Sequence, residues 1–195
     1  MRFLPRSLLG NIAGETGKPR MSNKANSILV LGGIRSGKSA LAERLATESG
    51  QPVVYLATAT AGDEEMAERI ARHQQQRPGD WGLVEEPVDL AAVLSAQGQR
   101  DPAPAVLIDC MSLWLSNLLQ EPQHRFAEHR QAFLEAVERY PGPVVIVSNE
   151  VGLGIIGMDS LTRRFADELG WLNQALASRC DRVLMSVAGL PLTLK

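Results

Sequence analysis

Gly32, Gly37, Lys38 and Ser39 have the types and spacing of a phosphate-binding loop, G-x-x-x-x-G-K-S. In such a loop, backbone N–H groups wrap a polyphosphate where little Cβ obstructs them, and the positive end of a helix faces it. The Lys38 ammonium is expected to reach the terminal phosphates, and the Ser39 hydroxyl to hold Mg²⁺. The pattern predicts that a nucleotide contacts the whole loop, namely Gly32, Gly33, Ile34, Arg35, Ser36, Gly37, Lys38 and Ser39.

The residues on either side have the patterns of the two elements that position such a loop. Residues 28–31 form an unbroken apolar run typical of a buried strand, and residues 40–46 have the apolar spacing of a helix. The alternative is a chance match in a glycine-containing turn. A turn of that kind requires neither a strand before it nor a helix after it, so the context favours nucleotide binding.

Strands and helices are predicted to alternate along the rest of the chain. Apolar runs predict strands at 53–57, 105–109, 144–147, 182–187 and 190–194, and helical patterns occupy 63–76, 89–96, 111–120, 124–140 and 160–178. This alternation predicts a three-layer α/β domain of the P-loop NTPase type around a mainly parallel sheet. The last two strands are separated by too few residues for a crossover, so we expect an antiparallel hairpin at an edge of the sheet.

Composition indicates one soluble cytoplasmic domain. The 195 residues have a net charge of −2 with acids and bases interspersed, which does not favour a nucleic-acid partner, and the apolar runs are too short to span a bilayer. Cys110 and Cys180 lie far apart without a C-x-x-C pattern, as expected of reduced thiols rather than a structural zinc site. Residues 1–26 are expected to form a disordered extension, with Met21 as an alternative start, and residues 27–195 a single domain.

Polar residues at the ends of two predicted strands are further candidates for ligand contacts. Thr58 and Thr60 follow the strand at 53–57, where loops of a parallel sheet line a ligand crevice, although Thr60 would serve equally well as a helix N-cap. Asp109 ends the apolar run at 105–109. A carboxylate at that position is typical of the second nucleotide-binding motif, which holds Mg²⁺ directly or through water.

His73 is a candidate nucleophile because Arg69, Arg72 and Arg77 surround it in sequence. Nearby guanidinium groups favour the neutral imidazole, and a neutral imidazole beside phosphate-binding arginines can attack a phosphorus atom. The alternative is a surface histidine at the end of its helix, where the helix dipole favours it anyway. The residues alone leave both interpretations open.

Five blocks of residues together resemble a known enzyme family. The blocks are residues 32–39, 55–58, 69–73 with Arg77, Pro78 and Trp81, 109–110 with 117–119, and 148–155, and residues 164–165 and 170–174 also fit. They closely resemble the bifunctional adenosylcobinamide kinase/adenosylcobinamide-phosphate guanylyltransferase family of cobalamin biosynthesis. The resemblance extends from about Ile28 to Lys195 and implies a RecA-like fold and a homotrimer.

The resemblance also implies a reaction and a set of site residues. Members phosphorylate adenosylcobinamide with ATP or GTP, and then transfer GMP from GTP through a guanylyl-histidine, which falls on His73, to give adenosylcobinamide-GDP. Contacts to GTP fall on residues 32–39 and on Thr58, Ala59, Thr60, Gln74, Gln75, Gln76, Arg77, Glu85 and Asp109, with Mg²⁺ expected at Ser39 and Asp109. Some members have Glu in place of Asp109, which preserves the carboxylate, and many have a more basic run in place of residues 74–76.

Two other functions stay open at this point. A small-molecule kinase would use the phosphate loop alone and leave His73 without a role. A regulatory nucleotide switch would reorder its loops on binding and turn over little.

Overall fold

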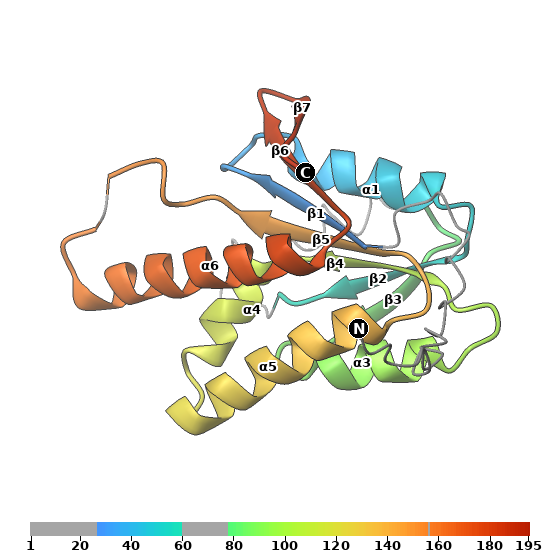
Figure 1. Ribbon diagram of the computed structural model, residues 1–195, viewed down its shortest axis with the longest axis horizontal. Coiled ribbons are helices and arrows are strands. Elements are labelled where there is room, and N and C mark those ends of the chain that lie inside the picture. Colours follow the sequence, from blue (N-terminus) through green and yellow to red (C-terminus); the bar gives the residue numbers. More distant parts are fainter. Residues whose placement is uncertain (1–26, 60–77, 156) are drawn as a thin grey trace, which may run out of the picture.

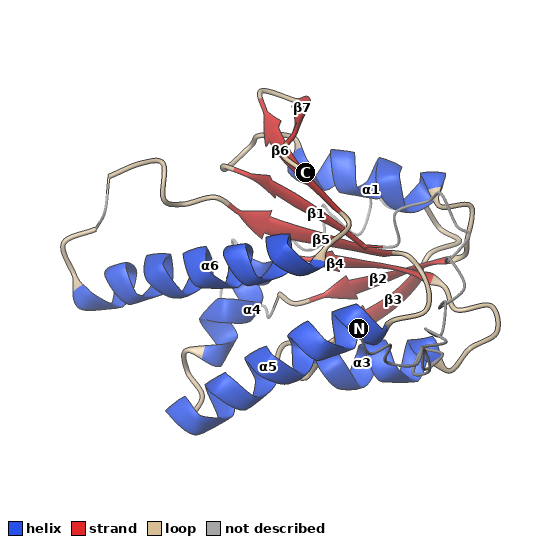
Figure 2. Ribbon diagram, viewed as in Figure 1, coloured by secondary structure: helices blue, strands red, loops and turns tan. Residues whose placement is uncertain are grey.

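The structure is a computed structural model, and it describes residues 27–59, 78–155 and 157–195. Helices lie on both sides of a central twisted sheet (Figures 1 and 2). This three-layer arrangement confirms the predicted α/β class.

The sheet has seven strands in the order β3-β2-β4-β5-β1-β6-β7. The strands are β1 (Ser27–Gly32), β2 (Val53–Ala57), β3 (Gly82–Glu85), β4 (Ala105–Asp109), β5 (Val144–Asn149), β6 (Arg182–Val187) and β7 (Leu190–Thr193). All neighbouring strands are parallel except β6 and β7, which form an antiparallel hairpin. The predicted parallel sheet with an antiparallel edge is therefore confirmed.

The described helices are divided between the two faces of the sheet (Figure 1). They are α1 (Lys38–Glu48), α3 (Leu90–Gly98), α4 (Met111–Leu118), α5 (Gln123–Arg139) and α6 (Ser160–Arg179). Helix α1 covers one face, and α3, α4, α5 and α6 cover the other. Successive side chains of a strand point to opposite faces, so Ile28 and Val30 pack with α1, whereas Leu29 and Leu31 pack in the larger core.

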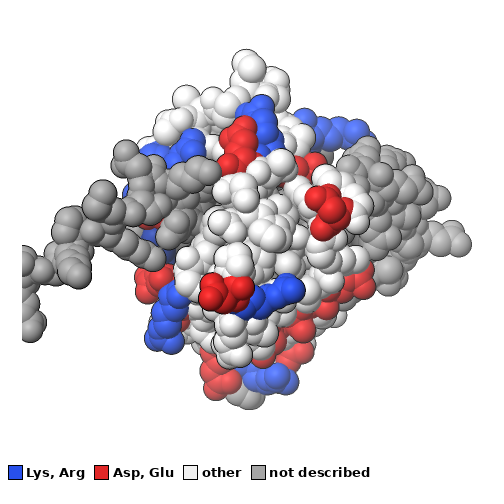
Figure 3. Space-filling view, turned by 90° about the vertical axis from the view of Figure 1, so that its right-hand side faces the viewer, with Lys and Arg blue, Asp and Glu red and all other residues white. Residues whose placement is uncertain are grey.

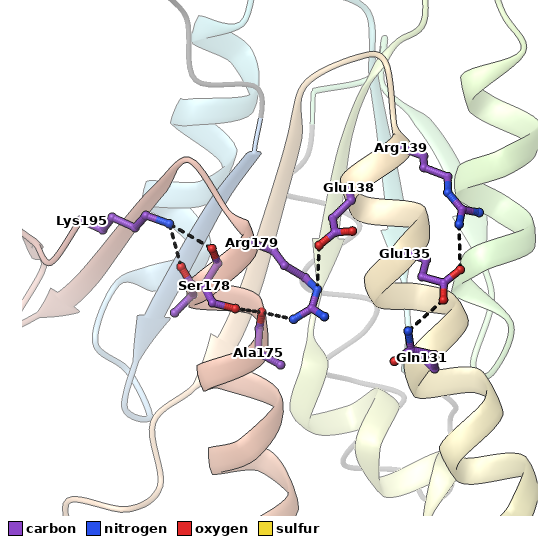
Figure 4. A network of polar contacts seen from close by, with 9 residues as sticks. Gln131, Glu135, Glu138, Arg139, Ala175, Ser178, Arg179 and Lys195 are labelled. Atoms are coloured by element: carbon purple, nitrogen blue, oxygen red, sulfur yellow. Dashed lines mark hydrogen bonds and ion pairs between the residues drawn. The ribbon is translucent and has the colours of Figure 1, made fainter. Parts of the chain in front are cut away.

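Polar contacts join α5, α6 and the last residue of the chain (Figure 4). Glu138 on α5 forms an ion pair with Arg179 on α6 at 2.9 Å. The Lys195 ammonium donates to the carbonyl oxygens of Ala177, Ser178 and Cys180 at 3.1, 3.2 and 2.7 Å. A cation at the end of α6 satisfies carbonyl groups that have no partner within the helix and complements the helix dipole.

Charges of both signs are mixed over the described residues of the face in Figure 3. Blue and red groups lie among uncharged residues there, in keeping with the net charge of −2. None of the helices within residues 27–59, 78–155 and 157–195 combines the length and the apolar character that crossing a membrane requires.

Strand β3 was not predicted as a strand. Three of its four residues are exposed, and it begins with a glycine at one edge of the sheet, so its sequence lacks a continuous apolar run. The predicted helix at 63–76 and the predicted disordered extension lie outside the described residues. The other predicted elements are present, with ends shifted by at most two residues.

Candidate nucleotide-binding site

The parallel strands bring most of the predicted site residues to one edge of the sheet. The phosphate loop follows β1, Thr58 and Ala59 follow β2, and Glu85 and Asp109 end β3 and β4. Ala57 on β2 pairs with both Glu85 and Asp109, so these two acids lie at the same level of the sheet. Ligands of open parallel sheets bind at this edge, outside the carboxyl ends of the strands.

The phosphate loop is wound tightly between β1 and α1. The Gly33 carbonyl accepts hydrogen bonds from the Ser36 N–H at 3.3 Å and from the Lys38 ammonium at 3.2 Å. Lys38 therefore folds back over its own loop and has two further N–H donors. Ile34 and Arg35 are exposed at the tip, and Ser36 is buried.

Gly37 gives the loop its geometry at the start of α1. It is the N-cap of that helix with a φ of 89°, in the left-handed region that favours glycine. Because glycine has no side chain to accept the first N–H groups of the helix, these donors stay available to an anion. The positive end of α1 therefore lies at the phosphate loop, as the sequence pattern predicted.

Ser39 and Asp109 have the chemistry that Mg²⁺ requires. Both side chains are partly exposed, and in the described part of the chain neither makes a hydrogen bond or an ion pair. Ser39 lies in the first turn of α1, which packs against β4 and β5, and Asp109 ends β4, so both residues lie at the edge of the sheet that carries the phosphate loop. One or two protein oxygens are enough for the ion, because Mg²⁺ usually keeps several waters. The residues present therefore fit Mg²⁺.

The Thr58 side chain is bonded within the protein, and its predicted contact with a ligand stays a prediction. Its side chain is fully buried, and its hydroxyl both donates to the Cys110 carbonyl and accepts from the Cys110 N–H, each at 2.8 Å. The Asn117 amide donates to the Thr58 carbonyl at 2.9 Å and to the Pro87 carbonyl at 3.0 Å. Thr58 therefore joins the ends of β2 and β4 and holds the chain beside Asp109. Its single O–H donor is used by the Cys110 carbonyl, so in this arrangement the hydroxyl cannot donate to a phosphate oxygen.

Cys110 lies behind Asp109 in a buried polar cluster. Burial raises the pKa of the Cys110 thiol, and the neighbouring Asp109 carboxylate raises it further. The Cys110 sulfur lies 3.0 Å from the Ser112 hydroxyl, which also accepts a hydrogen bond from the Asn149 amide at 3.0 Å. The thiol is therefore protonated at neutral pH and acts as a small packing group rather than a nucleophile.

Asn149 and Asn173 were not predicted as site residues, although they hold the strand beside the phosphate loop. Asn149 ends β5 and pairs with Gly32, and its carbonyl accepts a hydrogen bond from the Asn173 amide at 3.0 Å. Asn173 on α6 also accepts from the Ser148 hydroxyl at 2.6 Å. The signal in the sequence was a polar run, residues 148–150, directly after a buried strand.

Glu85 lies far from the phosphate loop. Strands β2, β4 and β5 separate β3 from β1, so the distance is four sheet spacings, or about 19 Å. Glu85 therefore cannot share a phosphate group with Lys38. Its predicted GTP contact stays a prediction, as do those of Thr60 and residues 74–77, which with His73 lie outside the described residues.

Comparison with known proteins gives a family model and two relatives that match most of the chain. Residues 28–194 match the family model described as cobinamide kinase / cobinamide phosphate guanyltransferase. The chain is 53% identical over 169 residues to the bifunctional adenosylcobalamin biosynthesis protein CobP of Pseudomonas aeruginosa, covering 86% of this chain and 96% of that protein. It is 37% identical over 182 residues to the bifunctional adenosylcobalamin biosynthesis protein CobU of Escherichia coli, covering 86% and 99%. Among solved structures, the RadB recombinase is 19% identical with a TM-score of 0.45, covering 82% of this chain and 73% of that chain.

Proposed function

The chain belongs to the cobinamide kinase / cobinamide phosphate guanyltransferase family, and we propose on this basis that it catalyses both reactions on adenosylcobinamide. In the first, ATP or GTP phosphorylates the aminopropanol hydroxyl. In the second, GMP from GTP is joined to that phosphate to give adenosylcobinamide-GDP. In a chain of this family, the observation that carries the proposal is the phosphate loop. The loop lies between a buried strand, β1, and the N-terminus of α1, where no side chain caps the first N–H groups.

The phosphate loop supplies the electrostatic part of the kinase step. Backbone N–H groups of residues 32–39 and the start of α1 face the polyphosphate, and Lys38 has free N–H donors for the phosphoryl group in transfer. Mg²⁺ held at Ser39 and Asp109 would neutralise charge on the phosphate oxygens. Preformed donors of this kind stabilise the transition state without reorganising during the reaction.

The second reaction is proposed to pass through His73. A neutral imidazole nitrogen attacks the α-phosphorus of GTP, a nitrogen–phosphorus bond forms, and pyrophosphate leaves. A phosphate oxygen of adenosylcobinamide phosphate then attacks the same phosphorus and releases the imidazole. The R-I-x-x-H spacing of residues 69–73 in a chain of this family supports the assignment.

The remaining proposals concern the domain organisation, the oligomeric state and the cellular location of the protein. We propose that residues 27–195 form one kinase/guanylyltransferase domain, that the protein acts as a homotrimer, and that it works in the cytoplasm on small-molecule substrates. The resemblance of the whole domain to the family supports the trimer, and two unpaired buried thiols, Cys110 and Cys180, suit a reducing compartment.

Labelled nucleotides test the proposed function directly. The purified protein is incubated with adenosylcobinamide and nucleotide that is radiolabelled at either the α- or the γ-phosphorus. We expect label from γ-labelled nucleotide in adenosylcobinamide phosphate, and label from α-labelled GTP first in the protein and then in adenosylcobinamide-GDP. Transfer of the γ-phosphate alone would reduce the function to that of a kinase, and no transfer of either label would refute it.

A further inference from the structure

The C-terminal hairpin of β6 and β7 lies directly against the phosphate loop. The Ser36 carbonyl accepts two hydrogen bonds from the hairpin, one from the Ser186 hydroxyl at 2.7 Å and one from the Gly189 N–H at 2.9 Å. Ser186 is 1% exposed and pairs with Gly32 in the parallel ladder of β1 and β6. These contacts join residues that are about 150 positions apart in the sequence, and they involve the loop backbone itself.

The two hydrogen bonds fix the orientation of a peptide plane in the loop. The Ser36–Gly37 peptide bond is trans, so the Ser36 carbonyl and the Gly37 N–H point in opposite directions. Since the carbonyl points at the hairpin, the N–H must point away from it. That N–H belongs to the N-cap residue of α1, beside the N-terminal donors of the helix to which a polyphosphate would bind.

We propose that Ser186 is a positioning residue for the phosphate loop: its hydroxyl holds the Ser36–Gly37 peptide so that the Gly37 N–H faces the nucleotide. This inference rests on the proposed function only in taking the ligand to be a nucleoside polyphosphate. The hairpin is therefore part of the binding site, although none of its residues needs to touch the ligand.

The close packing of loop and hairpin agrees with this role. A Cβ at Gly32 would lie 2.8 Å from the Ser186 carbonyl oxygen, and a Cβ at Gly37 would lie 3.1 Å from Gly189 Cα. Side chains at these two positions would push the hairpin away from the loop. The glycines of the phosphate loop thus serve the contact with the hairpin as well as the approach of phosphates.

The turn of the hairpin directs the Gly189 N–H toward the phosphate loop. Val187 pairs with Leu190, which leaves a two-residue turn of Ala188 and Gly189 with φ values of 52° and 79°. Positive φ at both positions is the type I′ geometry of tight hairpins. In this turn the Gly189 N–H points out of the hairpin, where it reaches the Ser36 carbonyl.

Nucleotide affinity measures the effect of Ser186 without any acceptor substrate. We would titrate the protein calorimetrically with an α,β-methylene analogue of GTP and Mg²⁺, because the carbon bridge prevents transfer to His73. Ser186→Ala should weaken binding about 3- to 10-fold, the usual worth of one hydrogen bond. Ser186→Thr keeps the hydroxyl and should bind within about two-fold of the wild type.

Tyr140→Phe is the matched control. It removes another buried hydroxyl, which donates to the Pro104 carbonyl at 2.8 Å far from the loop. This variant should melt at a lower temperature, yet bind the analogue as tightly as the wild type. Wild-type affinity in Ser186→Ala, or an equal loss in Tyr140→Phe, would overturn the inference.

The outcomes separate this inference from the proposed function. A wild-type chain that binds the analogue but does not phosphorylate adenosylcobinamide would refute the proposed function and leave the role of Ser186 standing. A wild-type chain that does not bind the analogue at all would overturn both.

Discussion

Replacement of Thr58 by valine removes one hydroxyl and keeps the shape of the side chain. In the folded protein that hydroxyl makes two buried hydrogen bonds, with the N–H and the carbonyl of Cys110. The Cys110 carbonyl also accepts a bond from the backbone N–H of Trp114 at 3.1 Å, so it keeps one partner in the variant. Within the described part of the chain the Cys110 N–H has no second acceptor, so it loses its partner in the variant.

The expected loss of stability follows from these two changes. A buried donor without a partner costs about 1–3 kcal/mol, and a lost bond to a carbonyl that stays bonded costs about 0.5–1.5 kcal/mol. We therefore expect Thr58→Val to lower the free energy of unfolding by about 2–4 kcal/mol. Thr58→Ser keeps the hydroxyl and removes one buried methyl group, which should cost about 1 kcal/mol.

Urea unfolding of the three proteins gives the free energies, and a titration with nucleotide in EDTA gives the affinity without metal. We expect the stability order wild type, Thr58→Ser, Thr58→Val, with nucleotide affinities within about three-fold of one another. A Thr58→Val protein within 0.5 kcal/mol of the wild type would refute the reasoning, since experiment resolves a loss of about 1 kcal/mol. Lost affinity with unchanged stability would show that the hydroxyl contacts the ligand after all.

Three further predictions concern the phosphate loop, the metal and a buried thiol. Lys38→Ala should cost about 3–4 kcal/mol of transition-state stabilisation, measured as a fall in the kcat/KM of the kinase reaction. The stability in urea should stay near that of the wild type, because among the described residues the ammonium has only the Gly33 carbonyl as a partner. Kinase turnover within ten-fold of wild type would contradict the assigned role of Lys38. Asp109→Asn should weaken Mg²⁺-dependent catalysis more than nucleotide binding in EDTA, and equal losses in both conditions would indicate a purely structural acid. Burial raises the pKa of the Cys180 thiol from 9.0 to about 12, with a further contribution from Asp181. Above about pH 9 the unfolded chain therefore loses this proton while the folded chain keeps it, and stability falls by up to about 1.4 kcal/mol per pH unit until about pH 12. Thermal unfolding of Cys180→Ala should decline less steeply than that of the wild type above pH 9, and parallel curves would contradict this assignment.

Local sequence patterns were sufficient to predict the phosphate loop and most of the sheet. Strands buried on both faces are continuous apolar runs, as at 28–31 and 105–108, and the loop pattern specifies its own backbone. Strand β3 was missed because its exposed residues at the sheet edge lack such a run.

Roles that depend on tertiary contacts could not be predicted from the sequence. Thr58 bonds to Cys110, 52 positions away, so its hydroxyl is occupied by the protein rather than left for a ligand. Ser186 meets Ser36 from 150 positions away, and no short motif marks that pair. Glu85 was grouped with the phosphate loop by resemblance, and only the strand order revealed the four strand spacings between them.

The central claim, that one chain combines a phosphate loop with a nucleophilic histidine, is tested most directly by labelling of His73→Ala. The purified wild type and variant are incubated with GTP radiolabelled at the α-phosphorus, and protein-bound label is measured after denaturation. The wild type should carry label that acid releases and base does not, as expected of a phosphorus–nitrogen bond. The variant should carry none, yet keep a substantial part of its kinase activity, because the phosphate loop is intact. Wild-type labelling of His73→Ala would show that another residue is the nucleophile and would contradict the account.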